Sequence, residues 1–443
     1  MHIKRHKIFT TQNQSIYNKQ EEKIKQLILK NNQNYGEGAE IMLESGDIFL
    51  LKESKNIMRI GIDATFLPRD KRGMGMVVRN FLQGYQKVKS EQDELFFLTF
   101  KPHLLEDIKQ EVGHLGACST FKEAPQDLDI CWYPWDRADI YLPCAKVLTV
   151  HDAVVWKAES GKKAYRDWPK VNREFTQIVT ISKYVKGLFE KFFPEVKSDL
   201  KVSYNSINNI YYQKAIEPQY RDEQKRQQYM DKVTGGAPFL FFVGNAYEEN
   251  KDLLSLLQAL YTLRDEFPHK ILIAGNEPKS NISFWKRLFP DEHTKYVQEI
   301  KSYLEKLPGR VVYTGQLNPE GMLEPYSYCD CLAAVSRYEG FFLPLIEAMN
   351  CQAPIFSVNR EPLPEVGGEV PFYYEADNQE DMVEKLRFVL QYRRSAEKQE
   401  LFAEKIKTGL ERAQLFTPEK QAKNMLNIFA QAIEKHKQKQ KQK

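Results

Sequence analysis

Two carboxylates eight residues apart, Glu339 and Glu347, have the spacing and surroundings that best suit a chemical role. Between them runs Gly340-Phe341-Phe342-Leu343-Pro344, followed by an expected helix over 345–350. The glycine lets backbone amides approach a ligand, and the proline suits a first helical turn. The start of that helix would offer unpaired N–H groups to a phosphate. A carboxylate can accept hydrogen bonds from two vicinal hydroxyls, so the pair suits a ribose or sugar ring, whereas Glu347 alone could be an incidental charge on a solvated helix face.

Short apolar runs that alternate with helical patterns must position these residues. Their continuous apolar character indicates strands buried on both faces, as in a parallel sheet. The expected strands are 58–63, 95–100, 130–133, 146–150 and 178–181, then 239–243, 271–274, 311–313, 332–335 and 355–358. Helices are expected between them, for example over 76–87, 183–192 and 253–263. Two successive doubly wound α/β units predict two Rossmann-like domains facing a cleft, with ligands bound at the carboxyl ends of the strands.

The string that begins at Ser336 resembles a signature of the retaining group 1 (family four) glycosyltransferases, which have the GT-B fold. Their pattern reads Ser-x-x-Glu-Gly-Phe-Gly-Leu-Pro-x-x-Glu-Ala-Met-x-x-Gly-x-Pro-Val. The matching residues are Ser336, Glu339, Gly340, Phe341, Leu343, Pro344, Glu347, Ala348, Met349 and Pro354, with Ile355 close to the last position. Phe342 and Gln352 stand where the family usually has glycine.

The resemblance implies roles for this string. Glu347 would bind the donor ribose, and Glu339 would lie against the transferred sugar. Gly340 and the amides near Phe341, Phe342 and Leu343 would approach the sugar or the diphosphate. The phenylalanine in place of glycine would narrow the donor pocket or strain the loop.

The segment 242–251 resembles the first strand and diphosphate loop of the same family's C-terminal domain. Asn245 takes a position that often holds arginine, and Lys251 follows with a one-residue insertion relative to the family. The resemblance implies that Asn245 belongs to the donor site and that Lys251 neutralises the leaving diphosphate. Without it, a lysine in a strand-to-helix loop is most often a solvated charge.

Two further motifs follow expected strands of the first half. Arg72-Gly73-Met74-Gly75 resembles the family's glycine-rich loop, which implies that Gly75 lies near the diphosphate; alone, such a motif is often only a turn. Val150-His151-Asp152 closes the fourth expected strand, and in the family a His-Asp pair there faces the cleft near the sugar and the acceptor. His151 is therefore a catalytic candidate, with a structural histidine as the alternative.

Three other motifs are read as structural. Ser182 is expected to cap a helix, and Glu365 to lie at a helix start rather than act as a catalyst. Asp127-Leu128-Asp129 is an Asp-x-Asp, the metal signature of another glycosyltransferase fold, but it precedes an apolar strand and we predict no metal site there.

The predicted fold is thus α/β of the GT-B type with an N-terminal extension. The extension covers 1–56, including a helix over 20–30 and a short hairpin within 40–52. An acceptor-side Rossmann-like domain covers 57–215, a nucleotide-sugar-binding domain 238–410, and a C-terminal helix with a basic tail 411–443. The polar stretch 213–236 is the expected hinge.

The predicted activity is transfer of a hexose from a nucleotide diphosphate sugar, with retention and without a catalytic metal or other cofactor. GDP-mannose is the first candidate donor and a UDP-hexose the second. The expected acceptor is a glycan or a lipid-linked saccharide, as in polysaccharide biosynthesis. Two alternatives remain: a catalytically impaired GT-B partner subunit, and a phosphorylase or epimerase that shares the fold.

Composition limits the partners and the compartment. The formal net charge of +4 over 443 residues does not indicate nucleic-acid binding. The basic ends, 1–7 and 435–443, are either disordered solvated runs or a weak contact with an anionic membrane. No apolar stretch is long enough to span a bilayer, no signal peptide is recognisable, and six unpaired-looking cysteines suggest reduced thiols. A cytoplasmic protein, peripheral at the inner membrane surface at most, is expected.

Overall fold

The structure is a computed structural model. It describes residues 40–44, 47–51, 57–71, 73–90, 92–136, 141–152, 174–194, 200–277, 291–391 and 396–442. Residues 1–56 and 57–443 form two separate units. In the first, strands β1 (Glu40–Glu44) and β2 (Asp47–Leu51) pair antiparallel, which confirms the expected hairpin. The helix predicted over 20–30 lies outside the described residues.

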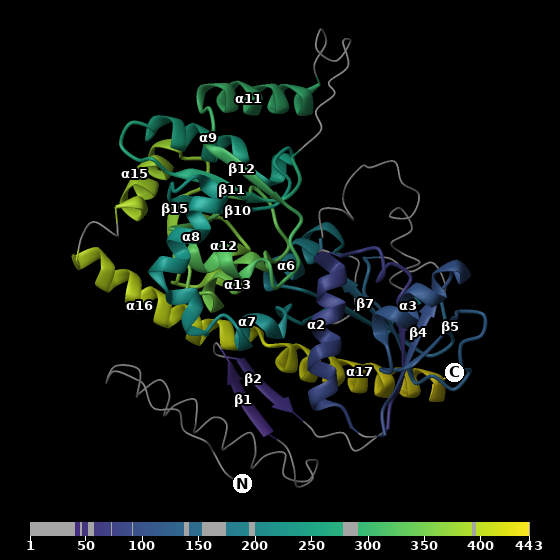
Figure 1. Ribbon diagram of the computed structural model, residues 1–443. Helices are drawn as coiled ribbons and strands as arrows, with labels where there is room; N and C mark the ends of the chain where they lie inside the picture. The colour runs from purple at the N-terminus through teal and green to yellow at the C-terminus, as the bar shows by residue number, and fades with distance from the viewer. Residues whose placement is uncertain are drawn as a thin grey trace. The chain divides into compact units, whose positions relative to one another are not determined.

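The second unit begins with a seven-stranded parallel sheet of order β5-β4-β3-β6-β7-β8-β9 (Figure 1). Its strands are β3 (Arg59–Asp63), β4 (Glu94–Thr99), β5 (Ala117–Thr120), β6 (Ile130–Tyr133), β7 (Ala145–Val150), β8 (Gln177–Thr180) and β9 (Leu200–Val202). Its helices are α2 (Gly73–Val88), α3 (Leu105–Val112) and α6 (Lys183–Phe192). The five strands predicted here are confirmed to within one residue at each end, whereas β5 and β9 were not predicted because these edge strands are short and only partly apolar.

A six-stranded parallel sheet of order β12-β11-β10-β13-β14-β15 follows. Its strands are β10 (Phe239–Val243), β11 (Lys270–Ala274), β12 (Val311–Gly315), β13 (Cys331–Ala334), β14 (Ile355–Asn359) and β15 (Phe372–Glu375). Its helices are α9 (Leu253–Thr262), α11 (Glu292–Lys306), α12 (Leu323–Tyr328), α13 (Pro344–Asn350), α14 (Leu363–Gly367) and α15 (Gln379–Leu390). The strand order reverses between β10 and β13, and the carboxyl ends at such a switch point are where ligands bind in doubly wound sheets. The predicted α/β class with two doubly wound domains is confirmed.

Helices cover both faces of this second sheet. Helices α9, α11 and α15 pack together on one face, and α12 and α13 on the other, as Figure 1 shows. The four central strands β10, β11, β13 and β14 are almost wholly buried, whereas the edge strands β12 and β15 are largely half-buried. Burial on both faces explains why the central strands read as continuous apolar runs.

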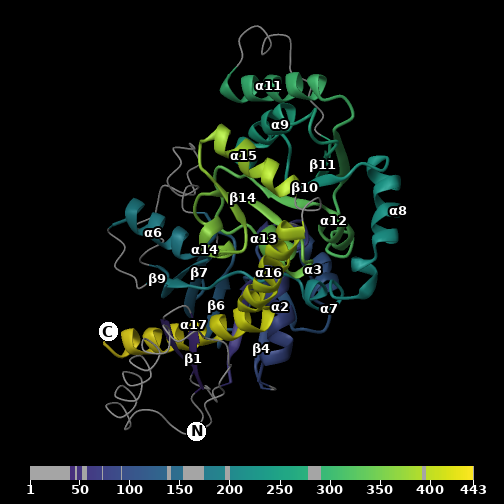
Figure 2. The same cartoon turned by 90° about the vertical axis from the view of Figure 1, so that its left-hand side faces the viewer.

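The chain then returns to the first sheet. Helix α16 (Ala396–Ala413) packs on α13, and α17 (Pro418–Lys441) packs on α2 and on β7 (Figures 1 and 2). The ring of Phe429 lies 6.2 Å from that of Phe81 and 6.0 Å from that of Trp132. Helix α17 thus completes the aromatic core of the N-terminal sheet, and the run that starts at residue 435, a candidate for a disordered end, is helical through Lys441.

The stretch predicted as a hinge, 213–236, is mostly ordered helix. Between α7 (Asn209–Gln213) and β10 lies α8 (Glu223–Thr234). The buried Arg226 of α8 places Nη2 2.8 Å from Asp330 Oδ1, and its Nε donates to the carbonyl of Tyr328 at 3.0 Å. The other Asp330 oxygen lies 2.8 Å from Nε2 of the buried His269. These contacts hold α8 on the C-terminal sheet, so flexing along its length is not expected.

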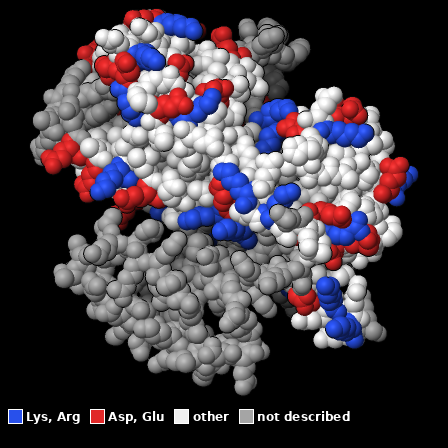
Figure 3. All heavy atoms as spheres, turned by 60° about the horizontal axis from the view of Figure 1, so that its bottom comes forward, with Lys and Arg blue, Asp and Glu red and all other residues white. Residues whose placement is uncertain are grey.

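No helix in the described residues is both long and apolar enough to cross a membrane. All six cysteines are free, and five of them are buried. On the face drawn in Figure 3, basic side chains lie among acidic ones, in keeping with the small net charge.

Candidate functional site

Two loops at the switch point bring Lys251 and Glu339 together. Strands β10 and β13 are neighbours in the sheet, so the loops that follow them lie side by side. Lys251 Nζ lies 2.6 Å from Glu339 Oε1, and the two side chains are only 18% and 13% exposed. Gly244, with φ +146°, makes room for the lysine: a Cβ there would lie 3.2–3.3 Å from three carbons of its side chain. Both residues were predicted, and the structure pairs them.

Phe342 is a third neighbour of Lys251, beside Glu339 and Gly244. It has φ +72°, the left-handed conformation for which glycine is favoured and which costs other residues about 1–2 kcal/mol. Its buried ring lies with its centroid 5.6 Å from Lys251 Nζ, a cation–π contact. Gln352, the other departure from the family pattern, also has positive φ, at +57°. At both positions the backbone keeps the glycine-like conformation although the residue has changed.

Gly340 lies where the two domains touch. A Cβ at this position would lie 2.2 Å from the backbone oxygen of His151 and 3.3 Å from Ile181 Cδ1. The hydroxyl of Ser182 donates to the Gly340 carbonyl at 2.9 Å. The close approach that this glycine permits is therefore to the N-terminal domain, and the structure does not test its predicted approach to a ligand.

His151 is buried at the end of β7, and both its amide and its ring are hydrogen-bonded within the chain. Its amide donates to Asp136 Oδ1 at 2.6 Å, and its ring Nε2 lies 2.8 Å from the carbonyl oxygen of Pro134. A ring nitrogen facing a carbonyl must carry the proton, which assigns the Nε2–H tautomer to the neutral ring. Burial lowers the pKa of His151 to about 4, so the imidazole is neutral near pH 7. The neighbouring Asp152 accepts a hydrogen bond from the hydroxyl of Tyr338.

Glu347 lies in the first turn of α13 between two tyrosine hydroxyls. Tyr326 donates to Glu347 Oε2 at 2.7 Å, and Tyr211 also hydrogen-bonds the carboxylate. Burial raises the pKa of Glu347 to about 7, and the two hydroxyls oppose that rise. Sequence reasoning missed both tyrosines, which come from α12 and α7, because no local motif links them to the glutamate.

The amides at the start of α13 are already used. Leu345 N–H donates to the carbonyl of Phe342 at 3.2 Å, while those of Ile346 and Glu347 donate to the carbonyl of Leu343 at 3.0 and 3.2 Å. The prediction of unpaired N–H groups at these three positions is therefore wrong. Tight turns of this kind at a helix start satisfy donors that an ideal α-helix leaves free.

Phe341, predicted in the donor site, turns its side chain into the core. Its ring is 6.0 Å from that of Tyr204 and 5.8 Å from that of Phe416. Leu343 is half-buried beside it. The Phe341 side chain is therefore not available for the predicted contact with a donor, and only the backbone of this residue could make it.

Gly75 and Asn245 have polar partners within the chain. The Gly75 amide donates to Asp70 Oδ2 at 3.0 Å, and a Cβ would lie 1.9 Å from the Asp70 carbonyl oxygen. A carboxylate thus occupies the place that the prediction gives to a diphosphate. Asn245 donates through Nδ2 to Glu248 and brings no charge to the loop that contains Lys251.

The motifs read as structural make structural contacts. Glu365 belongs to α14, and its carboxylate accepts from the amides of Lys183 and Tyr184 at 2.6 and 2.8 Å, across the domain boundary. Ser182 accepts from the Val185 amide at 3.0 Å, which confirms the predicted cap of α6.

The Asp-x-Asp motif binds a neighbouring strand. Asp127 pairs with the Arg59 guanidinium, and Asp129 Oδ2 accepts from the Arg59 amide at 2.9 Å. No group of three or more His, Cys, Asp or Glu side chains within the described residues is arranged to hold a metal ion.

Two doubly wound domains, joined by a crossing C-terminal helix and meeting at these loops, define a GT-B fold. Solved structures agree. A glycosyltransferase from Rickettsia africae aligns with a TM-score of 0.59 and 14% identity, over 86% of this chain and 99% of that one. HepE from Anabaena, solved with UDP and glucose, aligns with a TM-score of 0.60 and 13% identity, over 85% and 100%. Sucrose-phosphate synthase from Thermosynechococcus elongatus aligns with a TM-score of 0.57 and 15% identity, over 84% and 98%.

Sequence comparisons find similarity to glycosyltransferases in part of the chain. Residues 237–392 match the family model described as glycosyl transferases group 1. A human α-1,3/1,6-mannosyltransferase, ALG2, is 24% identical over 226 residues, which are 47% of this chain and 49% of that protein. The chain therefore spans about half the length of that curated relative. Residues 237–392 are thus similar to group 1 glycosyl transferases, and the solved structures share the GT-B fold of this chain.

Proposed function

We propose that this protein transfers a hexose from a nucleotide diphosphate sugar to a glycan or lipid-linked acceptor, with retention and without a catalytic metal. The observation that carries the proposal is the enclosed Lys251–Glu339 pair at the switch point of the C-terminal sheet. The match of 237–392 to group 1 glycosyl transferases supports it. GDP-mannose is the first candidate donor, because the curated relative is a mannosyltransferase, and a UDP-hexose is the second, because HepE is solved with UDP-glucose.

The chemistry needs positive charge at the leaving group. In the proposed step, the bond from the anomeric carbon to the diphosphate oxygen breaks while the acceptor oxygen bonds the same face of that carbon. The acceptor proton passes late to the leaving phosphate. Negative charge builds on the diphosphate, and a fixed cation at that point is worth several kcal/mol because it needs no reorganisation. Lys251, held by Glu339 and by the Phe342 ring, fits this role.

The remaining residues would orient the substrates. Glu347, already in contact with two tyrosine hydroxyls, would accept hydrogen bonds from the donor ribose in its ionised form. His151 is neutral near pH 7, so its contribution would be a hydrogen bond rather than a charge. We place the reaction in the cytoplasm, with the exposed Lys437, Lys439 and Lys441 of α17 facing an anionic membrane surface.

One observation favours a second candidate, a GT-B partner subunit without catalysis. Asn245 adds no cation where the family often has arginine, and Glu339 neutralises Lys251. A protein of this kind would bind nucleotide weakly or not at all.

Binding of GDP and UDP separates these functions. Titration calorimetry with EDTA present would compare the wild type with Lys251→Ala and Glu347→Ala. A matched control is Lys306→Ala, which removes a lysine with a cation–π contact on α11, outside the loops. We expect preferential binding of one nucleotide, measurably weakened in both site variants and unchanged in the control. Absence of binding by the wild type would favour the partner subunit, and equal binding by all variants would refute the residue roles.

A further inference from the structure

A second ion pair joins the same two loops behind the first. Arg337 Nη2 lies 2.9 Å from Asp252 Oδ1. Asp252 follows Lys251 directly in the chain, and Arg337 precedes Glu339 by two residues. The front pair, Lys251–Glu339, and the rear pair, Asp252–Arg337, therefore cross-link the loops with opposite polarity.

A backbone hydrogen bond lies beside the two pairs. The amide of Arg337 donates to the carbonyl of Asn250 at 2.8 Å. Arg337 thus binds the residue before Lys251 with its backbone and the residue after it with its side chain. This single residue fixes the loop segment that carries the lysine on both sides.

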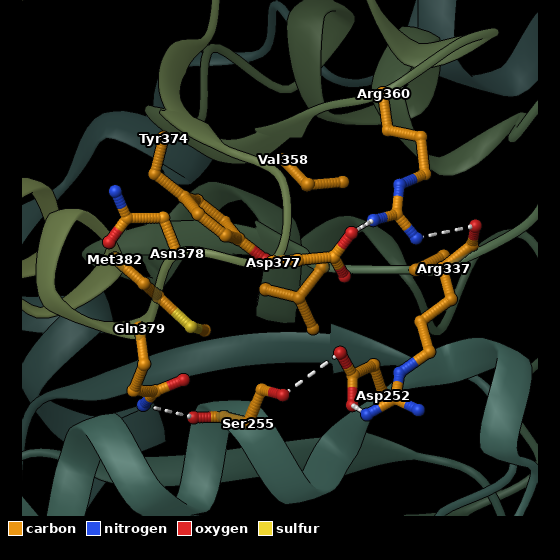
Figure 4. A pocket seen from close by; sticks show the side chains of 12 residues that line it. Asp252, Ser255, Arg337, Val358, Arg360, Tyr374, Asp377, Asn378, Gln379 and Met382 are labelled. Atoms are coloured by element: carbon orange, nitrogen blue, oxygen red, sulfur yellow. Dashed lines mark hydrogen bonds and ion pairs between the residues drawn. The ribbon is translucent and has the colours of Figure 1, made fainter.

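The rear pair lines a cavity of about 240 Å³, shown in Figure 4. In the same wall, Arg360 pairs with Asp377 and donates through Nη1 to the Arg337 carbonyl at 3.2 Å. Two arginines thus face two aspartates, and the four charges balance. The wall has no excess charge with which to attract an ion, so its polar groups serve mainly to hold the loop.

Asp252 is itself rigidly placed. It is 7% exposed and has φ +53°, and Ser255 Oγ donates to its Oδ2 at 2.9 Å. The Arg337 side chain is 48% exposed and that of Asp252 only 10%, so the pair is buried on the carboxylate side alone. A carboxylate with so little exposure is destabilised when it loses its cation, so the loop would shift if Arg337 lost its charge. Lys251, one residue away, would move with it.

We propose that Arg337 is a positioning residue that holds Lys251 at the leaving-group site through Asp252 and Asn250. This inference rests on the proposed function. A nucleotide diphosphate must draw Lys251 away from Glu339, which opens the front pair. The rear pair then keeps the two loops in register, so its loss is felt most when nucleotide is bound.

The test is a cycle of GDP and UDP titrations. Arg337→Gln should weaken binding of the preferred nucleotide about tenfold, and Arg337→Lys should restore part of the loss. Asp252→Asn should cause the same loss, with no further loss in the double variant. In a Lys251→Ala background Arg337→Gln should change affinity less than twofold, because the group through which it acts is gone.

A matched control and a melting curve separate positioning from folding. Arg387 lies on α15 and forms an ion pair with Glu266 outside the loops, so Arg387→Gln should leave binding unchanged. If Arg337→Gln does not fold, Arg337→Lys and Asp252→Asn carry the test. The inference would be overturned if the wild type binds a nucleotide and Arg337→Gln binds it with the same affinity. It would also be overturned if Arg337→Gln weakens binding as much in the Lys251→Ala background as in the wild type. Failure of the wild type to bind either nucleotide would instead refute the proposed function.

Discussion

The loops at the carboxyl ends of the two sheets differ in how their polar groups are bound. At the N-terminal sheet, the polar groups around the glycine-rich start of α2 are bound by nearby residues. Asp70 accepts from the Gly75 amide, and Arg79 donates to the carbonyls of Asp70 and Leu67. At the C-terminal sheet, Lys251 and Glu339 form a charged pair between two loops, one of which contains a phenylalanine with positive φ. A glycine-rich helix start therefore does not by itself make an anion site, since an internal carboxylate can take the place.

The largest effect should come from removing the cation of the C-terminal edge. Lys251→Ala should lower turnover by about 10²–10³-fold, as the loss of one preorganised donor to a developing anion does. Its melting temperature should also fall, because Glu339, only 13% exposed, is left without its cation. Transfer would be measured with the sugar donor of whichever nucleotide binds. Turnover within threefold of the wild type would remove Lys251 from the mechanism.

The next effect belongs to the N-terminal edge and should appear in stability instead. Arg79 Nε lies 2.6 Å from Glu111 Oε1, and its other nitrogens donate to two carbonyls at 2.6 Å. Arg79→Ala should lower the free energy of unfolding by about 2–3 kcal/mol, because charged hydrogen bonds are lost. Denaturant melts would measure this, with nucleotide affinity as the second readout. If Arg79→Ala folds but loses much of its nucleotide affinity, the N-terminal edge would also contribute to binding, and the two sheet edges would not differ as described.

A smaller effect should come from pH. Because the pKa of Glu347 is raised to about 7 in the folded protein, against about 4.3 in an unfolded chain, the folded state holds an extra proton between these values. Stability should therefore fall as pH rises through this window and stay lower above it. Nucleotide affinity should rise about tenfold from pH 6 to pH 8, since the ionised carboxylate binds the ribose.

Glu347→Gln provides the control for this pH dependence. In this variant both trends should flatten, because the titrating group is gone. A wild-type affinity that does not change with pH would show that the ionisation of Glu347 is not linked to binding.

The smallest effect concerns the backbone at Gln352. Its φ of +57° follows the end of α13, where glycine is preferred. Gln352→Gly should raise the free energy of unfolding by up to about 1 kcal/mol, because the strain of a side chain in the left-handed region is relieved. Gln352→Ala, which keeps a Cβ, should bring no such gain. Thermal melts of the two variants would decide.

The sequence predicted the central strands well and the site in part. Strands such as 239–243 are buried on both faces and so read as apolar runs, whereas the edge strands β5 and β9 lack that signal. The motif around Glu339 identified that residue of the front pair, and the resemblance in the loop after β10 identified Lys251.

What escaped prediction depends on contacts between distant residues. Tyr211 and Tyr326 meet Glu347 from separate helices. Gly340 leaves room for a backbone oxygen of the other domain, that of His151. The amides at the start of α13 are satisfied by a local turn that a sequence pattern does not reveal. Arg337 lies inside the motif, but its ion pair with Asp252 is seen only in the structure.

The crossing of α17 has a consequence for synthesis. Phe81 and Trp132 precede the second sheet in the chain, yet their ring partner Phe429 is translated only after that sheet. While the chain emerges from the ribosome, the first domain must wait with an uncovered aromatic surface until α17 arrives. Its folding is thus completed after translation of the second domain, and premature termination before Phe429 would leave a surface suited to recognition by chaperones.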